Sequence, residues 1–112
     1  MIDQLLKQQY DYMIHKSFFY KQRLKRGELP EKISGVKELG QLPFTYKQDF
    51  RDYYPFGFLA TDKAKIVRYG ETTGTTGNPT ASFITKKDWE NNLRYTVASY
   101  SEFFTPQDTA II

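Results

Sequence analysis

An unusual loop lies between two short β-strand patterns in the second half of this chain. Residues 70–80 contain three glycines and five threonines, while the flanking runs, 64–69 and 81–84, are rich in β-branched and aromatic residues. Glycines permit backbone angles that other residues avoid, and threonine hydroxyls donate hydrogen bonds. The sequence therefore predicts a strand-loop-strand unit whose loop can gather hydrogen-bond donors around an oxyanion such as a phosphate.

Composition alone does not decide what this loop does. It lacks the glycine-lysine-serine or glycine-lysine-threonine step of the most common nucleotide-binding loop, and no helix pattern begins directly after it. A glycine-threonine hairpin can also be an ordinary turn between two strands. Phosphate binding and a plain turn are therefore both open interpretations at this point.

The chain begins with a strong helix pattern. Apolar residues recur at helical spacing from residue 2 to residue 24, with polar residues between them. Gly27 can take the left-handed conformation that caps a helix, and Pro30 stops it. One continuous helix over 2–24 is therefore predicted.

Two shorter helices are predicted to follow. The first covers 34–39 and opens on a serine. The second covers 46–53, where Thr45 and Gln48 have the spacing of a capping box. Together with the first helix they predict a helical subdomain over residues 1–60.

Residues 61–112 are predicted to form a strand-loop-strand-helix unit. Thr85 and Asp88 have the spacing of a helix cap, and the helix that follows is expected to stop before Pro106. One apolar stripe runs along that helix and consists of Trp89, Leu93, Val97, Tyr100 and Phe104. Core packing, rather than a ligand pocket, is the expected role of the aromatic residues here, which are Trp89, Tyr95, Tyr100, Phe103 and Phe104. Because 110–112 resembles an unpaired strand start, we expect the chain to continue into a larger mixed sheet.

Composition excludes several classes of function. At 112 residues the chain has room for one domain or part of one. Its 16 basic and 13 acidic residues are interspersed, and this weak charge favours no nucleic-acid partner. The absence of cysteine excludes disulfides and thiolate metal sites. No apolar stretch is long enough to span a bilayer and the start does not read as a secretory signal, so we expect no membrane partner and a cytoplasmic location.

Three segments resemble one branch of the adenylate-forming enzymes. Residues 72–80 resemble the phosphate-binding motif of that superfamily, usually Ser-Ser-Gly-Thr-Thr-Gly-Lys-Pro followed by Lys or Thr. A second segment resembles the stretch upstream of this loop in phenylacetate-CoA ligases, through Leu42-Pro43-Phe44-Thr45, Lys47, Asp49, Arg51-Asp52 and Tyr54-Pro55-Phe56-Gly57. A Ser-Pro-Phe-Tyr element in the first helix of the same branch is matched by Ser17, Phe19 and Tyr20. The resemblance covers nearly the whole chain.

The resemblance implies that residues 1–112 are the amino-terminal part of an AMP-binding domain with an α/β fold. Such a ligase activates a small carboxylic acid, aromatic acids included, with ATP and Mg²⁺, and transfers the acyl group to coenzyme A. The loop residues that would hold the β- and γ-phosphates are Thr72, Thr73, Gly74, Thr75, Thr76, Gly77 and Asn78. No catalytic residue or metal ligand is assigned here, because the motifs for adenine, ribose and the catalytic lysine have no counterpart. We therefore expect this chain alone to be inactive and the remainder of the same polypeptide to complete the site.

Two positions depart from the motif. Asn78 stands where the family commonly has lysine, and Thr80 stands where the wider superfamily often has a second lysine, although threonine suits the phenylacetate branch. Asparagine donates hydrogen bonds without charge, so charge neutralisation falls to Mg²⁺ or to residues outside this chain. Two alternatives stay open: an adenylating relative with an acceptor other than coenzyme A, and a non-catalytic stand-alone binding or interaction module that kept the loop.

Overall fold

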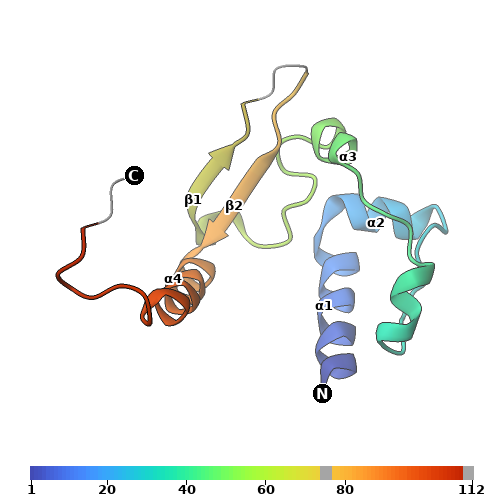
Figure 1. Cartoon of the computed structure of the whole chain (residues 1–112). Helices are drawn as coiled ribbons and strands as arrows, with labels where there is room; N and C mark the ends of the chain where they lie inside the picture. Colours follow the sequence, from blue (N-terminus) through green and yellow to red (C-terminus); the bar gives the residue numbers. More distant parts are fainter. Residues whose placement is uncertain (74–76, 110–112) are drawn as a thin grey trace.

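The computed structural model describes residues 1–73 and 77–109. Figure 1 shows an amino-terminal group of helices beside a two-stranded sheet, with a long helix after the second strand. The Cα radius of gyration is 17.5 Å, whereas a compact domain near this size has about 13 Å. The arrangement is therefore open. It fits part of an α/β domain, and the larger mixed sheet stays a prediction.

The predicted first helix is two helices. α1 (Ile2–Lys16) and α2 (Phe18–Lys25) are separated by Ser17, whose backbone is extended, with φ −79° and ψ 132°. The continuous helix is wrong because a carbonyl from a distant segment competes for the helix donors. The Phe19 amide donates to the Gly57 carbonyl oxygen at 2.8 Å. Gly27 has φ +73°, which confirms the predicted left-handed position.

The two short helices lie near their predicted places, but their ends differ. The 3-10 helix η1 (Val36–Gln41) starts after Gly35, two residues later than predicted. α3 (Lys47–Asp52) is capped by Tyr46, whose amide donates to Asp49 at 2.7 Å, so the pairing of Thr45 with Gln48 is wrong. The Thr45 hydroxyl instead lies 3.2 Å from the Tyr20 hydroxyl.

Two paired strands and a helix lie near their predicted places, with the first strand starting two residues later than predicted. After the short 3-10 helix η2 (Lys63–Lys65), β1 (Ile66–Glu71) pairs antiparallel with β2 (Ala81–Thr85). Tyr69 lies opposite Phe83 and Glu71 lies opposite Ala81. α4 (Lys86–Tyr100) begins at the predicted cap, where the Thr85 amide donates to Asp88 at 3.0 Å and the Asp88 amide donates to the Thr85 hydroxyl at 3.2 Å.

The core of the described residues lies in the helical part. It consists of Tyr10, Ile14, Leu29 and Ile33, with Leu6, Met13, Tyr20, Leu24 and Leu42 packed against it. The core role predicted for the aromatic residues of α4 and the segment after it is wrong for the described residues, because they are exposed, from Trp89 at 39% to Phe103 at 75%. Helical spacing shows which apolar residues share a face, but that face becomes part of a core only where another segment covers it. The described residues leave it largely exposed.

A membrane-spanning helix needs both sufficient length and sufficient hydrophobicity. Among residues 1–73 and 77–109, no helix combines the length and the apolar character needed to cross a bilayer.

Candidate functional site

The loop is closed at its base by Thr72 and Thr80. The Thr72 amide donates to the Thr80 carbonyl oxygen at 3.0 Å, and the Thr80 amide donates to the Thr72 hydroxyl at 3.1 Å. The two hydroxyl oxygens are 2.9 Å apart. These three contacts set the width of the loop immediately beyond the strands. The Thr72 hydroxyl therefore shapes the loop, in addition to the phosphate role predicted for it.

The structure locates four of the seven predicted site residues. Thr72, Thr73, Gly77 and Asn78 are exposed at the two ends of the loop. Gly77 has φ +89°, a left-handed conformation that a side chain would strain. The other three, Gly74, Thr75 and Thr76, lie outside the described residues. Convergence of all seven on a phosphate therefore stays a prediction.

A cation that was not predicted as a site residue lies next to the loop. Lys47 is the first residue of α3, and it lines an open hollow of about 440 Å³ together with Phe50, Thr80, Ala81 and Ser82. Figure 1 shows α3 beside the loop end of the hairpin. A lysine in the first turn of a helix faces the positive end of the helix dipole. Its location is therefore not explained by helix stability. The sequence feature that could have identified Lys47 is its place in the second segment that resembles the family.

A carboxylate and two phenols meet on the edge of the hairpin. Glu71, the last residue of β1, accepts hydrogen bonds from the hydroxyls of Tyr54 and Tyr69. Those two hydroxyl oxygens are 3.4 Å apart. Bonds from Tyr54 and Tyr69 hold the pKa of Glu71 below its usual range, and the bond to Glu71 raises the pKa of Tyr69. Glu71 is therefore a charged acceptor at neutral pH.

The segment that contains Tyr54 is attached to the helical part through Gly57. Both the Ser17 hydroxyl, at 3.1 Å, and the Phe19 amide, at 2.8 Å, donate to the Gly57 carbonyl oxygen. A Cβ at position 57 would lie 2.4 Å from Tyr53 Cβ, so only glycine fits. The first two segments that carry the family resemblance are thus joined around residues 53–58, and Tyr54 in this range contacts Glu71, the residue immediately before the third. Sequence reasoning did not predict that they meet there.

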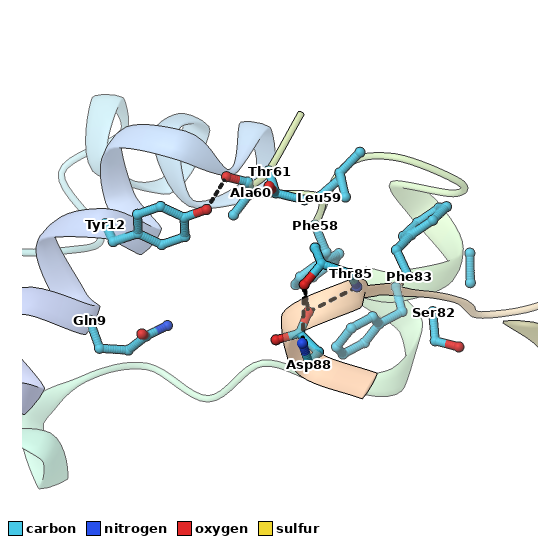
Figure 2. A pocket seen from close by; sticks show the side chains of 12 residues that line it. Gln9, Tyr12, Phe58, Leu59, Ala60, Thr61, Ser82, Phe83, Thr85 and Asp88 are labelled. Atoms are coloured by element: carbon cyan, nitrogen blue, oxygen red, sulfur yellow. Dashed lines mark hydrogen bonds between the residues drawn. The ribbon is translucent and has the colours of Figure 1, made fainter. Parts of the chain in front are cut away.

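A larger hollow separates α1 from the start of α4. Its volume is about 570 Å³. Figure 2 shows Gln9 and Tyr12 on one side of it and Ser82, Phe83, Thr85 and Asp88 on the other. Two of its polar side chains, Tyr12 and Asp88, are already bonded within the chain. The Tyr12 hydroxyl donates to Ala60 at 2.6 Å, and hydrogen bonds from the Thr85 side chain and amide hold the pKa of Asp88 below its usual range. This hollow offers shape but no free acid, base or nucleophile pair.

Metal-binding chemistry is not built into the described part of the chain. Within residues 1–73 and 77–109, no group of three or more histidine, cysteine, aspartate or glutamate side chains is placed to hold a metal ion. Among the described residues, the donors in and beside the loop are backbone amides, threonine and serine hydroxyls and Lys47. These groups suit an anion.

Comparison with known proteins connects the chain to one kind of ligase. No protein-family model matches it. Phenylacetate-coenzyme A ligase of Thermus thermophilus is 37% identical over 87 residues, which are 77% of this chain and 20% of that ligase. The ligase of the same name from Aromatoleum evansii is 41% identical over 63 residues, 56% of this chain and 14% of the relative. The one from Pseudomonas putida is 38% identical over 76 residues, 64% of this chain and 17% of the relative.

These comparisons confirm the predicted resemblance. The chain is related in sequence to phenylacetate-coenzyme A ligases, and the matched part corresponds to a fifth or less of the length of each of these relatives.

Proposed function

We propose that this chain is the phosphate-binding amino-terminal part of an ATP-dependent acid-CoA ligase. The observation that carries the proposal is its 37% identity with the Thermus thermophilus ligase over 77% of the chain. The loop at 72–80 supports it, because it joins two paired strands and is closed at its base by two threonines. The remainder of the ligase, the cytoplasmic location and the acid substrate are parts of the same proposal.

The reaction has two steps. In the first, a carboxylate oxygen of the acid attacks the α-phosphorus of ATP, the bond to the bridging oxygen breaks, and pyrophosphate leaves. In the second, the sulfur of coenzyme A attacks the acyl carbon and AMP leaves with the bonding electron pair. The loop acts in the first step. Its amides and hydroxyls donate hydrogen bonds to the β- and γ-phosphates and stabilise the charge that grows on the leaving pyrophosphate.

Lys47 supplies the positive charge that Asn78 does not. Lys47 lines the hollow that also contains Thr80 and Ser82, at the base of the loop. A cation next to a phosphate group attracts it over several ångströms, whereas a neutral amide acts only in direct contact. Mg²⁺, when bound with ATP, neutralises further phosphate charge. The donors near the loop fit the phosphates and not the metal, so the phosphates would carry the Mg²⁺.

The test is a chimeric ligase in which residues 1–112 replace the matching segment of the Thermus thermophilus enzyme. We expect pyrophosphate release from ATP that depends on phenylacetate, and thioester formation when coenzyme A is added. The unaltered Thermus enzyme is the reference for both measurements. A chimera that folds and still releases no pyrophosphate with any acid of an aromatic and aliphatic panel contradicts the proposal.

A further inference from the structure

Residues 53–58 form a turn that lies between the helical part and the hairpin, with contacts to both. We propose that Tyr54 and Glu71 are positioning residues, which hold the start of the phosphate loop in a fixed orientation on the helical part. This inference rests on the proposed function of the loop. It goes beyond that function by assigning roles to two residues outside the loop motif at 72–80.

One side of the turn is fixed by buried groups. The Gly57 carbonyl oxygen accepts from the Phe19 amide and from the Ser17 hydroxyl. The side chains of Ser17 and Phe19 are each only 1% exposed. The Gly57 amide also donates to the Tyr53 carbonyl oxygen at 2.8 Å, which closes the turn on itself. The turn therefore moves with α1 and α2.

The other side of the turn reaches the last residue before the loop. The Tyr54 hydroxyl donates to Glu71, and the next residue after Glu71 is Thr72, which closes the loop base with Thr80. Tyr69, two residues before Glu71 and on the same face of β1, donates to the same carboxylate oxygen. A displacement of Glu71 would therefore be passed to the loop through one peptide unit.

A second contact joins the turn to the hairpin but cannot fix its orientation. The rings of Phe56 and Phe83 are stacked with their centroids 5.4 Å apart. Aromatic pairs accept several offset and tilted arrangements, so this contact alone does not fix one orientation. Hydrogen bonds that converge on one carboxylate oxygen fix both distance and direction. The stack keeps the two parts together, and the Tyr54 bond sets how they are oriented.

The charge of Glu71 offers a way to distinguish positioning from simple electrostatics. A carboxylate one residue before a phosphate loop repels phosphate, so removing its charge should strengthen anion binding if charge is all that matters. If Glu71 positions the loop, replacing it by alanine should weaken binding instead. Glu71→Gln loses the same charge but keeps an acceptor oxygen for Tyr54. It should therefore bind better than Glu71→Ala.

The experiment is an NMR titration of the 112-residue chain with inorganic tripolyphosphate, read from the amide signals of Thr72, Thr73, Gly77 and Asn78. We expect Tyr54→Phe and Glu71→Ala to raise the dissociation constant about threefold to tenfold, because the lost bonds are to a charged acceptor but lie in an exposed cluster. Glu71→Gln should recover most of the affinity. Amide signals from α1 and α2 report whether each variant is folded.

Tyr10→Phe is the matched control. It also removes one tyrosine hydroxyl, which donates to Pro30 at 2.6 Å in the helical core and does not touch the hairpin. Its affinity for tripolyphosphate should equal that of the parent. If the parent binds at the loop and Tyr54→Phe and Glu71→Ala bind as well or better, the positioning role is wrong and the proposed function stands. If the parent shows no shifts at the loop, this inference fails, because the chain then does not hold the anion in which positioning would be seen, and the chimeric ligase still tests the proposed function separately.

Discussion

The Ser17 hydroxyl donates a hydrogen bond to the Gly57 carbonyl oxygen, across forty residues of sequence. This bond joins the first matched segment to the second, and Tyr54 in that second segment then contacts Glu71, the residue immediately before the third. Residues 53–58 are therefore where the chain connects its helices to its loop. The most direct structural consequence concerns Gly57.

We predict that Gly57→Ala destabilises the chain by about 1–3 kcal/mol, the usual cost of forcing an extra group into a packed site. The reason is the 2.4 Å approach that the new Cβ would make to Tyr53 Cβ. Gly40→Ala is the control, because a Cβ there would have nothing within 4 Å. Urea denaturation followed by circular dichroism measures both. Equal midpoints for the two variants would mean that the turn relaxes without cost.

A second prediction concerns the acid titration of Glu71. Its pKa is lowered in the folded chain by the hydrogen bonds from Tyr54 and Tyr69, so its contribution to stability is present above its ordinary value of 4.5. That contribution is lost as the pH falls through the lower folded value. Following the Glu71 side-chain carboxyl carbon by NMR should give a midpoint below 4.5.

Tyr54→Phe should move that midpoint upward, because one of the two donors is gone. Tyr10→Phe should leave it where it is, since Tyr10 donates to Pro30 far from the hairpin. A Glu71 midpoint that Tyr54→Phe does not change would show that the bond is absent in solution.

How much of this could be predicted from sequence depends on how local each feature is. The cap of α4 was predicted from Thr85 and Asp88 because both partners lie within four residues of each other. The break at Ser17 was missed, since its cause is a carbonyl forty residues away. The same holds for Tyr54 and Glu71, whose contact has no sequence pattern.

The apolar stripe on α4 shows another limit. Spacing correctly identified which residues share a face of the helix, but burial depends on a partner surface. The Arg68 guanidinium lies over the Trp89 ring, with its central carbon 5.0 Å from the ring centroid. Leu93 is 47% exposed. Lys47 was overlooked for a related reason. A lone lysine in a short helix becomes a candidate phosphate partner only when the loop is seen beside it.

A third prediction is that Asn78→Lys lowers the Michaelis constant of the chimeric ligase for ATP by about twofold to fivefold, as expected for one exposed charge pair. The added ammonium attracts the γ-phosphate, which asparagine cannot do without direct contact. Asn92→Lys, on exposed α4, changes the net charge equally and should leave the constant unchanged. The same decrease in both variants would indicate a general charge effect and not a loop contact.

The central claim is that the loop hydroxyls hold the phosphates of ATP, and the most direct test is the adenylation rate of the chimeric ligase with Thr72, Thr73, Thr75 and Thr76 each replaced by valine. Valine keeps the branched shape and removes only the hydroxyl. We predict that at least two of the four lose about 10- to 150-fold in rate, the value of one hydrogen bond to a charged group. Thr96→Val, on exposed α4, should match the parent, and the 112-residue chain alone should stay at background. If all four loop variants adenylate like the parent, the loop does not hold the phosphates.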